Sequence, residues 1–373
     1  MQRLTWPQVN AWRLAQQQLV TRAKPADLLA VVARLGGVQA QLMSAAELAL
    51  WARIDSLTAH DIQQLLWDAR KLVKTWAMRG TLHLLPTSEF GTFVAACAAT
   101  TVKRPPSYYT YHKVTSAELD AILRTVPLLL NATPVTREGL ADAVAEQTGN
   151  ANLRDVLLSG WGALLKPSAR RGELCFGPNQ GQNVTFVHPA AWLGKWDAAE
   201  SAAALQTVAR RFLTTYGPAT LDEFARWWGI DASQARKLFK SMEDELTSVD
   251  VEGWSAQLLT TTMDAIASAP AVQTVRLLPY FDPYTIAVAR HSDYLLPAAH
   301  KTKVYRAQGW ISPVVLVDGH IVGIWEHALK REKVEVSITL FAKPTRAIKD
   351  DLATEAERLG QFLGSEAKVI IKG

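Results

Sequence analysis

The chain has 373 residues, which is too long for one ordinary hydrophobic core and predicts two or three domains. Hydrophobic residues make up 49% of it and charged residues 20%, and no apolar run is long enough for a membrane span. The formal charge of +5 makes an anionic partner plausible, whereas two cysteines, Cys97 and Cys175, are too few for a disulfide framework or a cysteine-type zinc site. With no secretory signal at the N-terminus, composition predicts a reducing, cytoplasmic setting.

Residues 1–100 predict a first helical unit that ends in a wing-like strand. Thr5 and Gln8 have the spacing of a capping box at the start of the first helix. The predicted helices cover about 5–20, 26–35, 45–54 and 59–78, and the strand covers 80–85. Ser44 and Glu47 have the same capping-box spacing for the helix that starts near Ala45.

This first unit carries the motif Gly36-Gly37-Val38-Gln39-Ala40-Gln41. In non-helical backbone, side chains repeat every second residue, so the amides of Gln39 and Gln41 are expected to face one way, toward solvent. Two uncharged donor–acceptor groups aimed at one point suit the orientation of a water molecule or of a polar ligand edge. The structural alternative is that both amides cap the two neighbouring helices.

Residues 101–115 predict a linker in which basic and aromatic residues alternate, among them Lys103, Arg104, Tyr108 and Lys113. Such a segment suits phosphate attraction and base stacking, and we expect it to contact DNA. A proline-rich linker whose tyrosines pack against neighbouring domains explains the same sequence equally well.

Two further units, 116–197 and 198–373, share a pattern in which Pro134-Val135-Thr136 corresponds to Pro218-Ala219-Thr220. Each predicts helix, short turn, helix, the helix-turn-helix arrangement, after one preceding helix. The predicted helices cover 117–130, 136–148, 153–165, 200–216, 220–228 and 231–239, and strands at 173–176 and 184–187 form a wing. The C-terminal part predicts strands at 257–261, 274–278, 314–317, 321–325, 334–341 and 369–372 and a helix at 345–362. The fold class is therefore mainly α with β wings (α+β): three tandem winged-helix units forming a concave DNA-binding surface, with a C-terminal mixed β/α segment.

Basic residues fall where such units touch a duplex, and phosphate contacts from them supply sequence-independent affinity. The predicted contacts are Arg154, Lys166, Arg170 and Arg171 in the middle unit and Arg236, Lys237 and Lys240 in the last. Asp318-Gly319 is a strong two-residue hairpin signal, and we expect this turn, with His320, to approach a groove. The structural alternative for each charged residue is a solvated helix face.

Other chemistry is not indicated by the sequence. The eight histidines lack the short spacings of a zinc helix, and no glycine-rich phosphate loop follows a strand, so we expect neither a metal nor a cofactor. His83, in a strand between leucines, is expected to be a buried, hydrogen-bonded histidine.

Several segments resemble the AlkZ-like DNA glycosylases, a bacterial family of tandem winged-helix proteins. They are Val38-Gln39-Ala40-Gln41, Arg79-Gly80-Thr81-Leu82-His83-Leu84, Leu277-Leu278-Pro279-Tyr280-Phe281-Asp282 and the stretch from Gly309-Trp310-Ile311 to Gly323-Ile324-Trp325. The family's signature is Gln, apolar residue, Gln, which Gln39-Ala40-Gln41 resembles.

This resemblance implies a monofunctional DNA repair glycosylase that hydrolyses the N-glycosidic bond of alkylated purines, including bulky N7-guanine adducts and interstrand crosslinks. Gln39 and Gln41 are then the catalytic residues, and alkylated double-stranded DNA in the nucleoid is the partner. No membrane and no obligate protein partner is expected.

Two other functions fit a tandem winged-helix chain. A non-catalytic transcriptional regulator is the main alternative, because most winged helices bind DNA without cutting it, and it predicts preference for one operator sequence. A protein-interaction scaffold predicts weak DNA binding that is insensitive to salt.

Overall fold

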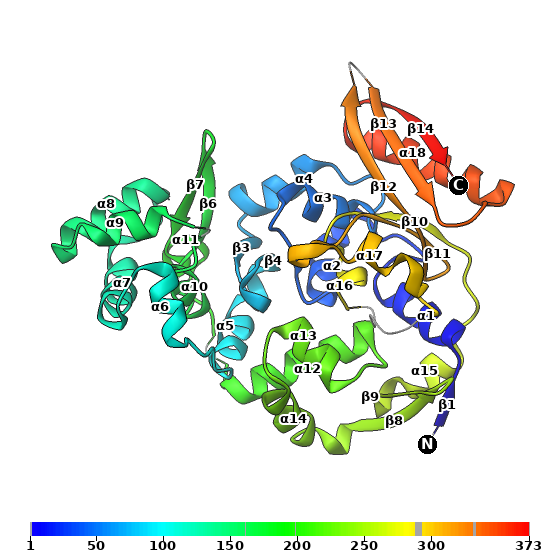
Figure 1. Ribbon diagram of the computed structural model, residues 1–373, viewed down its shortest axis with the longest axis horizontal. Coiled ribbons are helices and arrows are strands. Elements are labelled where there is room, and N and C mark those ends of the chain that lie inside the picture. Colours follow the sequence, from blue (N-terminus) through cyan, green and yellow to red (C-terminus); the bar gives the residue numbers. More distant parts are fainter. Residues whose placement is uncertain (1, 161, 198, 288–292, 331–332, 373) are drawn as a thin grey trace. The chain divides into compact units, whose positions relative to one another are not determined.

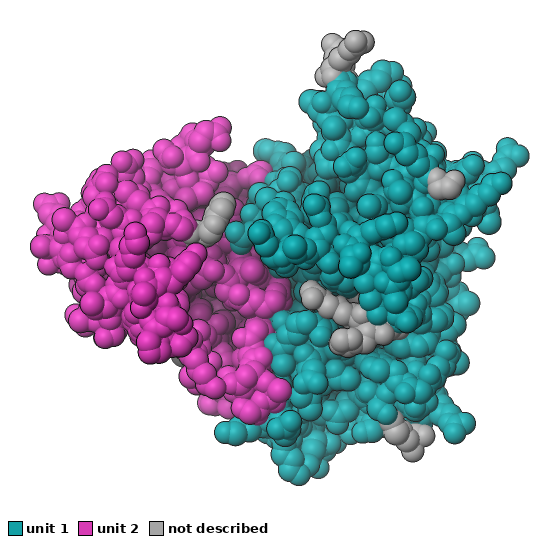
Figure 2. All heavy atoms as spheres, viewed as in Figure 1, with its two compact units in different colours: residues 1–62, 209–227, 235–373 teal, residues 63–208, 228–234 magenta. Residues whose placement is uncertain are grey.

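The computed structural model describes residues 2–160, 162–197, 199–287, 293–330 and 333–372. The chain forms two compact units, each assembled from separate stretches of sequence (Figure 2). Unit 1 comprises residues 1–62, 209–227 and 235–373, and unit 2 comprises residues 63–208 and 228–234. Within the described ranges, no helix is both long and apolar enough to cross a membrane.

Helices and small sheets alternate along the chain (Figure 1). The α-helices are α1 (Trp6–Gln16), α2 (Leu28–Arg34), α3 (Met43–Trp51), α4 (Ala59–Gln63), α5 (Phe90–Ala98), α6 (Pro106–His112), α7 (Ser116–Leu129), α8 (Arg137–Thr148), α9 (Asn152–Leu158), α10 (Lys166–Arg170), α11 (Pro189–Leu193), α12 (Ser201–Tyr216), α13 (Leu221–Trp228), α14 (Ala232–Lys240), α15 (Met263–Ala267), α16 (Pro283–Ala287), α17 (Lys301–Val304) and α18 (Arg346–Phe362). The strands are β1 (Gln2–Leu4), β2 (Val38–Gln39), β3 (Leu72–Trp76), β4 (Leu82–Pro86), β5 (Val135–Thr136), β6 (Cys175–Gln180), β7 (Asn183–Val187), β8 (Leu246–Val251), β9 (Trp254–Leu259), β10 (Val275–Leu278), β11 (Val314–Val317), β12 (His320–Lys330), β13 (Lys333–Leu340) and β14 (Glu366–Lys372).

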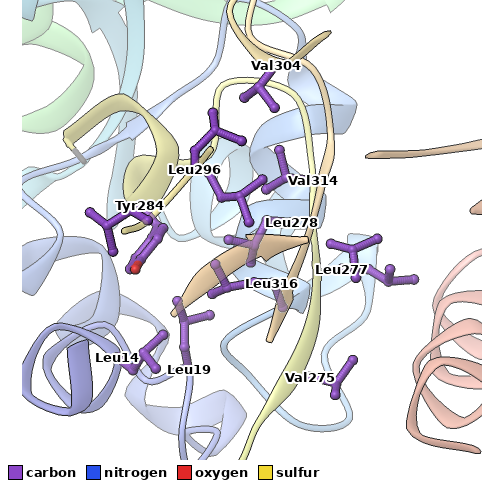
Figure 3. Close-up of a cluster of buried hydrophobic side chains, with 14 of the residues drawn as sticks. Leu14, Leu19, Val275, Leu277, Leu278, Tyr284, Leu296, Val304, Val314 and Leu316 are labelled. Atoms are coloured by element: carbon purple, nitrogen blue, oxygen red, sulfur yellow. The ribbon is translucent and has the colours of Figure 1, made fainter. Parts of the chain in front are cut away.

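A five-stranded sheet of order β10-β11-β12-β13-β14 is the largest of unit 1 (Figure 1). Its pairs are antiparallel except β13 and β14, which are parallel because α18 connects them. Figure 3 shows the hydrophobic cluster at the β10 and β11 end, where Leu278 and Leu316 lie toward Leu14 from α1 and Leu277 lies on the other side of the strands. Burial of these apolar side chains is the main force that holds α1 against the sheet.

A second sheet of unit 1, of order β1-β8-β9, brings the N-terminus to the strands that follow α14. β1 pairs with β8 in parallel, and Thr5 then caps α1 in a capping box with Gln8, as predicted. The Thr220 and Glu223 capping box is also present, with Thr220 N donating to Glu223 Oε2 over 2.8 Å.

Unit 2 contains the element order of a winged helix over residues 116–187. Helices α7, α8 and α9 are followed by the β6 and β7 hairpin, which joins β5 in a sheet of order β5-β7-β6. Leu123, Leu140 and Phe186 are buried in one cluster that joins these helices to the wing. The division of the whole chain into three winged-helix units around a concave surface stays a prediction.

Three local predictions were wrong. The helix expected over 59–78 ends at Asp68 in one π-helical turn, and strand β3 follows, because Leu72 to Trp76 pair with β4 in an antiparallel hairpin. The helix expected over 153–165 ends at Leu158, and the next helix, α10, begins after the predicted range, at Lys166. Helix α3 begins at Met43, before Ser44, so Ser44 is inside the helix rather than its N-cap.

A fully buried ion pair joins α3 to the turn after β10. The guanidinium of Arg53 donates from Nη1 to Asp282 Oδ2 over 2.7 Å and from Nη2 to Asp282 Oδ1 over 2.8 Å, and both side chains are 0% exposed. Arg53 Nη1 also donates to the carbonyl of Ala49, and Asp282 Oδ1 accepts from the backbone N–H of Tyr284. This bidentate pair therefore fixes where the α3 C-terminus lies against residues 279–284.

Replacement of Asp282 by Asn leaves the Arg53 guanidinium buried without its counter-ion. We expect D282N to lower the free energy of unfolding by about 3–5 kcal/mol, measured by urea denaturation. The matched control is E245Q, which removes the partner of Arg210 in a half-exposed pair of the same unit and is expected to change little. Equal unfolding curves for D282N and E245Q would show that the buried pair does not stabilise the fold.

Candidate active site

The Gln39 and Gln41 motif lies in the loop between α2 and α3 of unit 1. Gly36 and Gly37 have φ of +69° and +95°, values that L-residues rarely adopt, so these two glycines let the chain reverse after α2. Gly36 has a second constraint, because a Cβ there would lie 3.1 Å from the Trp227 ring. The loop therefore has one conformation that other residues at these positions would strain.

The carbonyl groups at the end of α2 all have partners. Backbone N–H groups of Gly36 and Gly37 donate to Ala33 O and Val32 O over 3.0 Å each. Thr215 Oγ1 donates to Arg34 O and the Tyr216 hydroxyl donates to Leu35 O, both over 2.7 Å. Helix α12 thus caps α2, and no glutamine amide is needed at that end, which counts against the capping alternative there.

The residues of the motif are buried from Val38 to Ala40 and exposed at Gln41. Val38 and Ala40 are 0% exposed, Gln39 is 8% exposed, and the Gln41 side chain lies in solvent. Residues 39–41 are non-helical, as predicted. The expectation that both amides face solvent is wrong for Gln39, which is nearly buried. One amide, that of Gln39, is thus nearly buried in the protein, and the other, that of Gln41, is exposed two residues further along the chain.

The predicted linker contains a helix, α6, and its basic residues differ in their surroundings. Lys103 is exposed and lies 3.6 Å from Asp231 Oδ2, and Lys113 is exposed at the left-handed C-cap of α6. Tyr108 is half-buried; burial raises the pKa of its hydroxyl, and the charge of Arg104 opposes that shift. The half-buried Tyr108 partly fits the alternative of a linker whose tyrosines pack against the protein. Lys103 and Lys113, by contrast, are accessible to a phosphate.

Three of the predicted DNA-binding arginines come together in unit 2. A groove of about 350 Å³ is lined by Arg104, Arg170 and Arg171, with Thr100 on its wall. Arg170 Nη2 donates to Cys97 O over 2.8 Å and to Thr100 Oγ1 over 3.0 Å, so this side chain also joins α10 to the end of α5. The groove collects positive charge, which suits a phosphate.

The other predicted DNA contacts are spread over both units. Arg154 on α9 is half-buried and pairs with Asp142 and Glu138, and burial lowers the pKa of Lys166. Arg236, Lys237 and Lys240 are exposed on α14 of unit 1, where Lys240 pairs with Glu243. DNA contact by these residues stays a prediction, with the strongest physical basis at Arg236 and Lys237.

The Asp318-Gly319 turn has the predicted hairpin conformation, with φ of +49° and +86°. It is held within unit 1, since Asp318 Oδ1 accepts from Thr274 N over 2.7 Å, and Gly319 O accepts from the Tyr284 hydroxyl over 2.8 Å. A Cβ on Gly319 would lie 2.6 Å from the Asn10 side chain, and His320 Nδ1 bonds to Tyr294 O. This packing counts against a groove contact by Asp318, Gly319 and His320, because the turn is used to join β11 and β12 to α1.

His83 is buried at 1% exposure in β4, as predicted. Its Nδ1 lies 3.0 Å from Thr81 O, and Nε2 lies 3.4 Å from Arg79 Nη2. Burial, with the nearby charge of Arg79, lowers its pKa to about 3. His83 is therefore neutral at neutral pH and unsuited to general acid catalysis there.

Among the residues that the structure describes, no three His, Cys, Asp or Glu side chains gather as a metal site would require. The residues that sequence reasoning missed are those that hold the loop, Thr215, Tyr216 and Trp227. No local signal marks them, because they lie far from the motif in the sequence.

The whole chain can be compared with known proteins. The model of the family "DNA glycosylase AlkZ-like" matches residues 32–362. The chain belongs to this family. It is 38% identical over 365 residues, 95% of this chain and 97% of its relative, to the "Interstrand DNA cross-link repair glycosylase" of Streptomyces sahachiroi. The solved structure of the Streptomyces sahachiroi DNA glycosylase AlkZ is similar with a TM-score of 0.90 and 37% identity, covering 99% of this chain and 100% of that one.

This AlkZ-like protein is thus a DNA glycosylase, an enzyme that hydrolyses the N-glycosidic bond between base and sugar, and the predicted family is confirmed. Its mixed helical and sheet fold agrees with the same structural match. DNA is its substrate, and a function restricted to regulating transcription does not fit this family.

The buried His83 makes the stability of this AlkZ-like glycosylase depend on pH. An unfolded histidine titrates near 6.5, whereas the folded pKa is about 3, so the unfolded state binds more protons between these values. The free energy of unfolding is therefore expected to fall as the pH decreases from 6.5. Urea denaturation at pH 7 and pH 5 should show a smaller loss for H83Q than for wild type, with exposed H60Q as the control. The same loss in H83Q and wild type would mean that other groups cause the dependence.

Proposed function

We propose that this glycosylase releases N7-alkylated purines from double-stranded DNA, with Gln39 and Gln41 positioning the water that replaces the base. The observation that carries the proposal is the glycine-bent loop, which fixes the two amides two residues apart, one in the wall and one at the surface.

The chemistry of the lesion explains why two neutral groups suffice. N7-alkylguanine already carries positive charge, so its bond to C1′ is weakened and the departing base needs no protonation. Water bonds to C1′ as the bond from N9 breaks; the electron pair of that bond neutralises the departing base, and the proton of the water passes to solvent. The remaining catalytic task is to hold the water and to stabilise an oxocarbenium-like transition state.

A carboxamide is well suited to that task and unsuited to others. Its oxygen accepts a hydrogen bond from water and its nitrogen donates one, but it does not accept a proton at neutral pH. In this proposal the exposed Gln41 contacts the water, and the nearly buried Gln39 orients it from within the protein. The rate gain is therefore selective for adducts whose bond is already labile.

The relative from Streptomyces sahachiroi is named for repair of interstrand crosslinks. We extend this substrate class to the present chain, because identity spans almost the full length of both proteins and because a crosslink between N7 positions presents the same cationic base. Bulky N7-guanine adducts belong to the same class of substrate.

Alanine at both glutamines removes the groups that hold the water. Q39A/Q41A is expected to lower the rate of base release from duplex N7-methylguanine by about a hundredfold or more, toward the rate without enzyme, while DNA affinity is kept. Release is measured as alkali-induced strand breaks at base-free sugars.

The control is Q361A, an exposed glutamine on α18, which should release the base at the wild-type rate. Wild-type rates in Q39A/Q41A would refute the assignment of the two residues. No release by the wild-type protein from either N7-methylguanine or a crosslinked duplex would refute the substrate class.

The exposed cations of α14 are expected to contact phosphates. R236A/K237A should weaken binding to an undamaged duplex and reduce the slope of log K against log salt by about 0.9 for each phosphate that the variant no longer neutralises. R154A is the comparison variant. Because Arg154 is already paired with Asp142 and Glu138, its replacement is expected to change the salt slope less than R236A/K237A does. An unchanged salt slope in R236A/K237A would remove α14 from the DNA interface.

A further inference from the structure

Three aromatic rings form a cluster on unit 1 that the proposed chemistry does not use. The Trp310 ring lies 5.2 Å from that of Phe281 and 5.8 Å from that of Tyr280, measured between centroids. Trp310 is 40% exposed, whereas most large apolar side chains of the described chain are buried. The cluster therefore leaves part of the Trp310 side chain accessible to solvent, with the Tyr280 ring packed edge-on and the Phe281 ring tilted against the indole.

The backbone under the cluster is strained. Phe281 has φ of +54° and Gln308 has φ of +58°, in the left-handed region that side chains with a Cβ rarely adopt. Such conformations persist only where the surroundings hold them, and they concentrate at functional sites. Both strained residues lie beside the cluster, since Phe281 is one of its rings and Gln308 is two residues from Trp310.

Several contacts hold these two strained positions. Asp282, next to Phe281, is locked by the buried pair with Arg53. The backbone N–H of Phe281 donates to Ile311 O over 3.4 Å, and that of Arg306 donates to Trp310 O over 2.8 Å. The indole is thus presented by a fixed loop, which reduces the entropy lost when a ligand stacks on it.

The charge around the cluster is positive. Residues 301–310 contain Lys301, Lys303 and Arg306 and no acidic residue. Lys301 pairs with Asp293, and Lys303 Nζ lies 5.3 Å from the centroid of the Phe341 ring, whereas Arg306 is exposed and its backbone N–H is bonded to Trp310 O. Cations beside an exposed aromatic ring are the combination that binds an unstacked base and its phosphates.

We propose that Trp310, supported by Phe281 and Tyr280, is a stacking site for a nucleobase that has lost its partner in the duplex. The inference rests on the proposed function, because release of a damaged purine leaves a base-free sugar and an unpaired base opposite it. Trp310 stacks on that base and Arg306 contacts an adjoining phosphate, so the enzyme holds the site from which the lesion has gone.

The test uses a duplex with one tetrahydrofuran residue, an abasic analogue without a glycosidic bond, and the same duplex fully paired. Full-length W310A is expected to bind the tetrahydrofuran duplex about tenfold more weakly than wild type and the paired duplex with unchanged affinity. W310F, which keeps a ring and its packing on Phe281, should retain most of the affinity. L363A is the control, since Leu363 is 38% exposed in the same unit but lies outside the cluster, and it should bind both duplexes as wild type does.

Three results overturn the inference: equal affinity of wild type for the two duplexes, wild-type binding by W310A, or an equal loss on both duplexes, which marks a structural or unspecific role. Circular dichroism and the Tm of W310A and W310F identify a folding defect, and the conclusion then comes from W310L, which keeps an apolar side chain in the cluster but no ring and should bind only the tetrahydrofuran duplex more weakly than W310F does. This binding test involves no hydrolysis. Its result is therefore independent of the base-release assay with Q39A/Q41A, and either proposal can be refuted while the other is supported.

Discussion

The buried Arg53–Asp282 pair is the constraint on which the arrangement of unit 1 depends. Two charges at 0% exposure are stable only with close mutual contact and further hydrogen bonds, and here the pair is bidentate and receives support from Ala49 O and Tyr284 N. Arg53 follows α3, the helix that continues from the candidate active-site loop, and Asp282 follows Phe281. One interaction thus ties the segment with the two glutamines to the segment with the aromatic cluster, and neither can move without exposing a charge to an apolar interior.

The second contribution to the loop comes from α12 and α13. Thr215, Tyr216 and Trp227 contact residues 34–36 from positions far along the chain, so the start of the loop is held by residues of α12 and α13. Val38 and Ala40 are 0% exposed and Gln39 is 8% exposed, so the loop is anchored in the protein as far as Ala40, and Gln41 is the residue of the motif that is exposed. The loop has few degrees of freedom left, which is what a site that works by positioning requires.

Local signals in the sequence predicted local structure well. The capping boxes at Thr5 and Thr220 and the Asp318-Gly319 turn were correct, because each depends on residues within four positions of one another. The segment 72–76 was predicted as helix and is a strand, since its pairing with β4 is a tertiary preference that overrides helical periodicity. The motif and its non-helical backbone were predictable, whereas the depth of Gln39 and the role of the 318–319 turn were not, because both are set by packing against distant residues such as Tyr284 and Asn10.

The neutrality of the proposed site limits the chemistry that it can perform and accounts for the proposed selectivity. Gln39 and Gln41 are uncharged at every physiological pH, and neither they nor the neutral His83 can protonate a normal purine at neutral pH. An undamaged guanine needs such a proton before it leaves, whereas an N7-alkylated guanine carries the equivalent charge within itself. On the proposed mechanism, discrimination between damaged and undamaged bases comes from the leaving group rather than from a recognition pocket, and a loop that holds water is sufficient for large adducts that a closed pocket would exclude.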